Sequence, residues 1–200
     1  MRKQDYRKLR GTNKETFELY NKRKLIYLDT VKLDDYENVY VTANVNIKPK
    51  ALHRMIKNTN DSIREYQIDN HDLRIIIVSY KDGFESYGQY DAISNCVYYN
   101  DVIANKEILL KENIELGHIE RHEMWHFKQA DDYRKRFKEI SLNNYLRYLA
   151  YANKKAKKFI DSRGINKDNI GVISVYANVS YRSNRFDEVE AEIMAKKGAK

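Results

Sequence analysis

His122-Glu123-Met124-Trp125-His126 is the stretch of this sequence that specifies a chemistry as well as a secondary structure. On an α-helix, residues four apart lie on the same face, so the imidazoles of His122 and His126 can reach one metal ion. Glu123 lies beside them, where its carboxylate can take a proton from a water on that metal. The pattern therefore predicts a helix with two metal ligands and a general base, although a surface helix with two incidental histidines would carry the same letters.

A catalytic zinc site needs three protein ligands and a fourth position for water, so one more ligand must come from elsewhere. The arrangement H-E-x-x-H-x-x-G-x-x-H is excluded, because Gln129 and Asp132 replace its glycine and third histidine. The other common source is a glutamate on a later helix. Glu188 and Glu192 lie one helical turn apart, so one could bind the metal while the other accepts a hydrogen bond from a ligand histidine. An acidic first turn that balances a helix dipole would explain the same pair.

Three segments together resemble one family: residues 121–126 (RHEMWH), 173–177 (ISVYA) and 187–192 (DEVEAE). They look like the glutamate-type zinc metallopeptidases (gluzincins) of bacteriophage, which occur alone or attached to phage minor head proteins. The order of the motifs is also similar to that in the catalytic domain of anthrax lethal factor. The resemblance covers about residues 115–195, and it implies that Glu188 is the third zinc ligand, with Glu192 as its partner one turn later.

The resemblance also implies a tyrosine that faces the metal and stabilises the oxyanion. A spacing of seven residues before the ligand glutamate selects Tyr181, whereas the local sequence motif S-x-Y-A selects Tyr176. The spacing favours Tyr181, and either residue could equally be an ordinary half-buried tyrosine. His118 lies one turn before His122 and shares its face, but we expect it to cap the helix or line the cleft rather than to bind metal.

The rest of the chain indicates an α+β protein. Helices are expected at residues 50–67, from about 106 or 113 to 130, at 142–161 and from near 187 onward, with a weak helical pattern at 17–25. Strands are expected at residues 39–47, 73–80 and 92–99, a loop at 84–91 and a β-like segment at 171–177. We therefore expect a zincin-like fold, in which a small mixed sheet packs on the motif helix and a C-terminal helix supplies the glutamate.

Composition suggests how the chain is divided and where it works. A shift near residue 48 separates a basic N-terminal arm or subdomain, residues 1–48, from a metallopeptidase domain, residues 49–200. No apolar run reaches the length of a membrane span, and the first residues lack the apolar region of a signal peptide. We therefore expect no membrane association and a location in the cytoplasm of a bacterial host cell or on the virion. Cys96 is the only cysteine, which excludes an internal disulfide and a cysteine-based metal cluster.

The net charge of +8 would let the protein associate with polyanions. Nucleic acid is only weakly supported as a partner, because no nucleic-acid-binding motif of a known kind is present and a lysine-rich solvated surface explains the charge.

Together these features predict a zinc-dependent metallopeptidase that hydrolyses a protein or peptide substrate. Zn²⁺ would be held by His122, His126 and Glu188, with Glu123 as the general base. The competing prediction is a phage structural module, or a module that binds DNA or the virion, which keeps the zinc site without turnover. Phage structural proteins are candidate partners in both cases.

Overall fold

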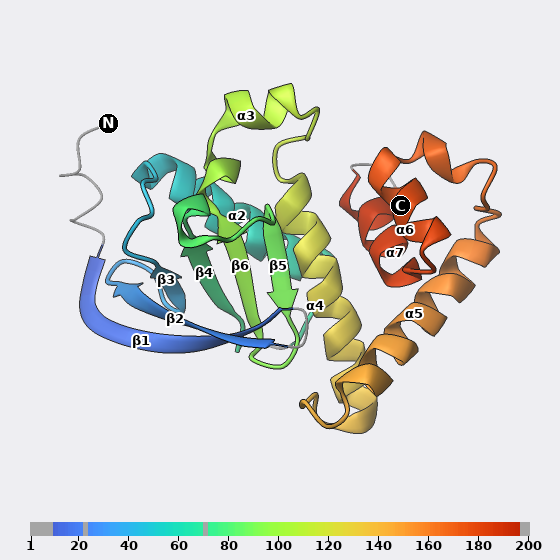
Figure 1. The fold of residues 1–200 in the computed structure, drawn as a ribbon, viewed down its shortest axis with the longest axis horizontal. Coiled ribbons are helices and arrows are strands. Elements are labelled where there is room, and N and C mark those ends of the chain that lie inside the picture. Colours follow the sequence, from blue (N-terminus) through green and yellow to red (C-terminus); the bar gives the residue numbers. More distant parts are fainter. Residues whose placement is uncertain (1–9, 22–23, 70–71, 197–200) are drawn as a thin grey trace.

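The computed structural model describes residues 10–21, 24–69 and 72–196, which fold into a mixed sheet and the helices packed beside it (Figure 1). The sheet has six strands in the order β1-β2-β3-β4-β6-β5. They are β1 (Arg10–Asn21), β2 (Lys24–Leu33), β3 (Val39–Val41), β4 (Arg74–Val78), β6 (Cys96–Asn100) and β5 (Gly88–Asp91). The pairs β3–β4 and β4–β6 are parallel, and the other pairs are antiparallel. The α+β class expected from the sequence is therefore confirmed.

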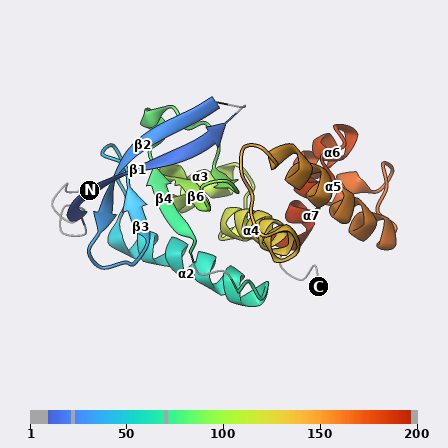
Figure 2. The ribbon, with the colours of Figure 1, turned by 90° about the horizontal axis from the view of Figure 1, so that it is seen from below.

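The central strands are apolar on both faces because both faces are covered. On one face, Ile75 and Ile77 of β4 pack with α2 (Pro49–Glu65) and α4 (His118–Phe137). On the other face, Ile76 packs with Phe17 and Leu19, since the β1–β2 hairpin lies across that side. Figure 2 shows this layering, with α2 and α4 on one side of the central strands and the hairpin on the other.

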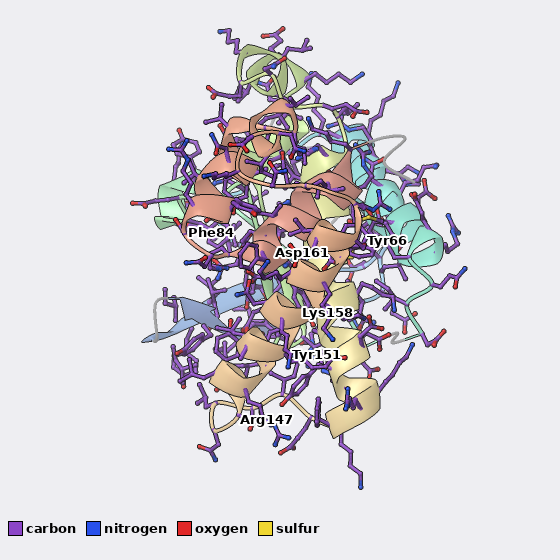
Figure 3. All side chains as sticks on the ribbon, turned by 90° about the vertical axis from the view of Figure 1, so that its right-hand side faces the viewer. Tyr66, Phe84, Arg147, Tyr151, Lys158 and Asp161 are labelled. Atoms are coloured by element: carbon purple, nitrogen blue, oxygen red, sulfur yellow. The ribbon has the colours of Figure 1, made fainter. Side chains whose placement is uncertain are left out.

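The C-terminal helices pack on the side of α4 that faces away from the sheet (Figure 1). They are α5 (Tyr145–Ser162), α6 (Val175–Arg182) and α7 (Phe186–Ala195), and the short helix α3 (Lys106–Lys111) precedes α4. Figure 3 faces α5 and shows Arg147, Tyr151, Lys158 and Asp161 in order along it. Three short 3₁₀ helices, Tyr80–Asp82, Asp101–Ala104 and Ile170–Val172, complete the described elements. None of the described helices is both long enough and apolar enough to cross a membrane.

The helical pattern predicted at residues 17–25 is wrong, because the described part of this segment, residues 17–21 and 24–25, lies in β1 and β2. Phe17 and Leu19 are buried while Glu18 between them is exposed, which is the two-residue period of a strand. The strand expected at 39–47 is also shorter than predicted and ends at Val41.

Two further segments differ from the prediction. The β-like segment at 171–177 is helical, because the Ser174 side chain accepts a hydrogen bond from the Ala177 N–H and caps the start of α6. The predicted loop at 84–91 contains β5, whose Gly88 and Gln89 gain strand geometry only by pairing with β6. The Ser174 cap is a local interaction, whereas the pairing of β5 with β6 is a tertiary effect on locally ambiguous sequence.

The composition shift near residue 48 marks no break in the sheet. β3 lies before it and β4 after it, yet Val39–Val41 pair directly with Ile75–Ile77. The strands β1 and β2 extend the same sheet beyond β3. Residues 1–9 of the expected arm and 197–200 of the expected domain lie outside the described residues.

Replacing Ile77 with alanine tests the central role of β4. Ile77 is 0% exposed and packs against both α2 and α4, so removing its methyl groups should lower the free energy of unfolding by about 2–5 kcal/mol. Leu110 is 77% exposed, and Leu110→Ala should change stability by about 0.5 kcal/mol or less. Chemical denaturation measures both variants, and equal effects would contradict the assigned core.

Candidate metal centre

α4 presents His122 and His126 on one face, as their spacing predicts. The ring centroids are 4.9 Å apart, and the two Nε2 atoms are 3.2 Å apart. The helix starts directly after Gly117, which has a φ of +85°. A side chain at that position would meet Arg121 and Asn58, so glycine allows both the turn and the close approach.

α7 brings Glu188 to the same point. Its Oε2 lies 3.3 Å from Nε2 of His122 and 3.2 Å from Nε2 of His126. The three ligand-type atoms thus form a nearly equilateral triangle, and together they make a group that could hold a metal ion. Zinc binds nitrogen and oxygen ligands tetrahedrally at about 2.0–2.1 Å, so its ligand atoms should be about 3.3 Å apart. Both the donor types and their separations therefore fit a zinc ion.

A second group, His118, His122 and Glu192, also lies close enough to hold a metal. Oε2 of Glu192 is 3.0 Å from Nε2 of His118 and 3.5 Å from Nδ1 of His122. Hydrogen bonds account for this geometry, because one carboxylate oxygen can accept from both rings. If Nδ1 of His122 carries the proton, its Nε2 keeps a lone pair that faces His126 and Glu188. Glu192 thus suits the supporting role that the sequence suggested.

The pKa shifts of the cluster favour positive charge between its groups. Burial alone would lower the pKa of His122, but hydrogen bonds to Glu188 and Glu192, together with the charges of Glu123 and Glu188, outweigh it and raise that pKa to about 10. Burial would raise the pKa of Glu188, yet His126 and His122 hold it well below its usual range. The lone pairs and carboxylate charge that converge here are therefore stabilised by positive charge between them, from protons or from a metal ion.

Glu123 is buried beside the two histidines, against β5. A methyl group added at Gly88 would lie 2.8 Å from Cγ and 2.9 Å from Oε1 of Glu123, so this strand can pass the carboxylate only because residue 88 has no side chain. Burial raises the pKa of Glu123, while His122 and His126 oppose that shift. A carboxylate with a raised pKa beside a metal site is suited to accept and return a proton.

Tyr176, and not Tyr181, reaches the cluster. The Tyr176 hydroxyl donates a hydrogen bond of 2.8 Å to Oε2 of Glu188, whereas the Tyr181 ring packs 5.4 Å from the ring of Phe186. The preference for Tyr181 from spacing is therefore wrong. Both residues lie on α6, and five residues correspond to about 140° around a helix, so the two rings face different sides.

Arg185 is a residue of the site that the sequence analysis missed. Its guanidinium donates to Oδ1 of Asp187 at 3.2 Å and to Oε1 of Glu188 at 2.6 Å. It therefore binds the carboxylate oxygen of Glu188 that does not face the histidines. The only sequence signal was its position three residues before Glu188, which is typical of many surface pairs.

A cavity of about 300 Å³ opens onto these residues. The cavity is lined from α4 and α7 by His122, Glu123, His126 and Glu188. β5 lines it from the sheet, and Tyr145, Tyr148 and Leu149 line it from α5. A ligand could therefore approach the cluster between the sheet and the C-terminal helices.

Comparison with known proteins adds no family, because no family model, curated protein or solved structure matches this chain. What the chain does must therefore be inferred from the site itself.

Two matched variants on α4 distinguish the two metal groups. His126→Ala should lower Zn²⁺ affinity more than 100-fold, because it removes a ligand and not merely an outer partner, whose loss costs roughly 10–100-fold. His118→Ala removes only a hydrogen bond to Glu192 and should cost about tenfold or less. Competition with a chromophoric chelator measures both affinities, and circular dichroism checks the fold. The opposite order would place the metal at His118.

Proposed function

We propose that this chain is a zinc-dependent metalloendopeptidase of the glutamate type. The observation that carries the proposal is the convergence of His122 Nε2, His126 Nε2 and Glu188 Oε2 at 3.2–3.3 Å beside a buried glutamate. Two imidazoles, one carboxylate and a neighbouring general base form a set of groups suited to peptide hydrolysis.

Each residue has a separate role in this proposal. His122, His126 and Glu188 hold the zinc, which when bound acidifies water and polarises the peptide carbonyl. Glu123 takes the proton of the attacking water and passes it to the leaving amine. Burial and the charge of Glu188 raise the pKa of Tyr176, so its hydroxyl stays protonated and can donate a hydrogen bond to the developing oxyanion.

The zincin-like fold is part of the same proposal, and the arrangement around α4 supports it. β5 is at the edge of the sheet, runs antiparallel to β6 and passes directly over Glu123. An extended substrate peptide could add to this edge as a further strand, with its carbonyl towards the cluster. The strand expected at residues 92–99 is β6, which lies inside the sheet and is covered on this side by β5.

The phage assignment rests on the resemblance in residues 121–126, 173–177 and 187–192. On that basis we propose a phage-related gluzincin that acts on a protein or peptide substrate, with phage structural proteins as partners. Its location would be the bacterial host cytoplasm or the virion.

Glu123→Gln should separate catalysis from metal binding. The amide cannot accept the proton of water, so cleavage should fall on the order of 10²–10⁴-fold while zinc stays bound. Mass spectrometry of a proteome-derived peptide mixture measures cleavage, and elemental analysis measures zinc. Glu112→Gln, an exposed position, is the control and should leave both unchanged.

Wild-type protein that binds zinc and cleaves nothing would favour a structural or binding module instead. Cleavage that survives Glu123→Gln would rule out the proposed base.

Tyr176→Phe and Tyr181→Phe form a matched pair for the oxyanion role. Tyr176→Phe should lower kcat on the order of 10²-fold with little change in KM, since the lost hydrogen bond matters mainly in the transition state. Tyr181→Phe should leave both constants unchanged, because its ring only packs against Phe186. Steady-state kinetics on one cleaved peptide measures both, and the reverse result would assign the role to Tyr181.

A further inference from the structure

Gln129 is a buried polar side chain on α4 that the proposed chemistry does not use. It is 4% exposed and follows His126 by three residues. Its Oε1 lies 2.9 Å from Nδ1 of His126. Its Nε2 lies 2.8 Å from Oε2 of Glu190 and 3.2 Å from the backbone oxygen of Asp187. Every polar atom of this side chain therefore has a partner.

These partners determine which way the amide points. The nitrogen of a glutamine amide only donates hydrogen bonds, and the oxygen only accepts them. A backbone carbonyl also only accepts, so the atom that faces Asp187 must be the nitrogen. The reversed amide would place two acceptor oxygens in contact there. The oxygen of Gln129 must consequently face His126.

The orientation of the amide determines the tautomer of His126. An acceptor oxygen at 2.9 Å requires Nδ1 to carry a hydrogen. A neutral imidazole has only one N–H, so Nε2 is then left with its lone pair. That lone pair faces the point shared with His122 and Glu188. This is the form of His126 that can bind a metal ion.

We propose that Gln129 is a positioning residue that holds His126 in its metal-binding tautomer and orientation, and that Glu190 fixes the amide of Gln129 for this purpose. This inference rests on the proposed zinc site. α7 then has two roles: it supplies the ligand Glu188, and its Asp187 carbonyl and Glu190 carboxylate orient Gln129. Glu190 is 4% exposed, whereas the sequence analysis expected only Glu188 and Glu192 of this acidic cluster to have a role.

In this arrangement each of the two ligand histidines has a hydrogen-bond acceptor facing its Nδ1 atom. His122 faces Glu192 through Nδ1, and His126 faces Gln129 through Nδ1. Partners of this kind fix ring orientation, and their loss typically lowers metal affinity roughly 10–100-fold.

The first test is Zn²⁺ affinity in the full chain. Gln129→Leu keeps a side chain of similar size but cannot accept from Nδ1, so the affinity should fall roughly 10–100-fold. The double variant Gln129→Glu with Glu190→Gln keeps an acceptor for His126 and gains a donor at residue 190, but its second oxygen then faces the Asp187 carbonyl. Its affinity should therefore lie above that of Gln129→Leu and below that of wild type. Gln89→Leu is the control, because Gln89 lines the same cavity but bonds to Tyr20.

The second test is spectroscopic, so that a merely structural effect can be separated. In the Co²⁺-loaded protein, the Nδ1–H of His126 should give a hyperfine-shifted proton signal that exchanges slowly with water. The signal should exchange rapidly or vanish in Gln129→Leu and persist in Gln89→Leu. Should Gln129→Leu fail to fold, Gln129→Asn, which is too short to reach Nδ1, serves in both tests with the same expected losses.

The outcomes separate this inference from the proposed function. Wild-type protein that binds no metal would overturn both. Wild-type protein that binds zinc, with unchanged affinity and proton signal in Gln129→Leu, would overturn the role of Gln129 alone. A folded double variant whose affinity is no higher than that of Gln129→Leu would overturn the hydrogen-bond mechanism, and a higher affinity would support it.

Discussion

The close packing of α7 on α4 is the contact on which the rest of the site depends. Ala191 and Ala195 are fully buried on α7, and their small side chains let the two helices approach closely. Hydrogen bonds from Arg121 to the Ala195 oxygen and from Tyr66 to the Met194 oxygen hold the end of α7 in place. Without this contact Glu188 would not reach His122 and His126, because it lies more than 60 residues from each of them in the chain.

This packing has an electrostatic cost, since it places several carboxylates in a region of low solvent exposure. Burying an unpaired charge is strongly unfavourable, so each acid needs a partner. Asp187 has Arg185, Glu190 has Gln129, and Glu192 has His118. Glu188 differs from these three, because its Oε2 faces two histidine nitrogens as well as the Tyr176 hydroxyl. All four acids thus have protein partners, and Oε2 of Glu188 in addition faces the point that His122 and His126 share.

How much of this could be predicted depended on the range of the interactions involved. The helices α2, α4, α5 and α7 follow from local periodicity although none of them has a side-chain cap, and the same periodicity predicts that His122 and His126 share a face. The choice between Tyr176 and Tyr181 depended on the packing of α6 against α7, which brings the Tyr176 hydroxyl to Glu188, and β5 forms by pairing with β6. Gln129 gave no signal, because its role depends on Glu190, 61 residues away. Polar residues that act through tertiary contacts look like any other polar residue in the sequence.

The N-terminal hairpin shows the same limit for domain boundaries. Composition separates residues 1–48 from the remainder, but the end of β1 is tied to the wall of the cavity. The Tyr20 N–H donates to Asp91, Gln89 donates to the Tyr20 oxygen, and the Tyr20 ring lies 5.0 Å from that of Tyr145. Gln89 and Tyr145 both line the cavity, from the sheet and from α5 respectively. The hairpin therefore contacts both the sheet and α5 beside the cavity, so the difference in composition does not make it a separate unit.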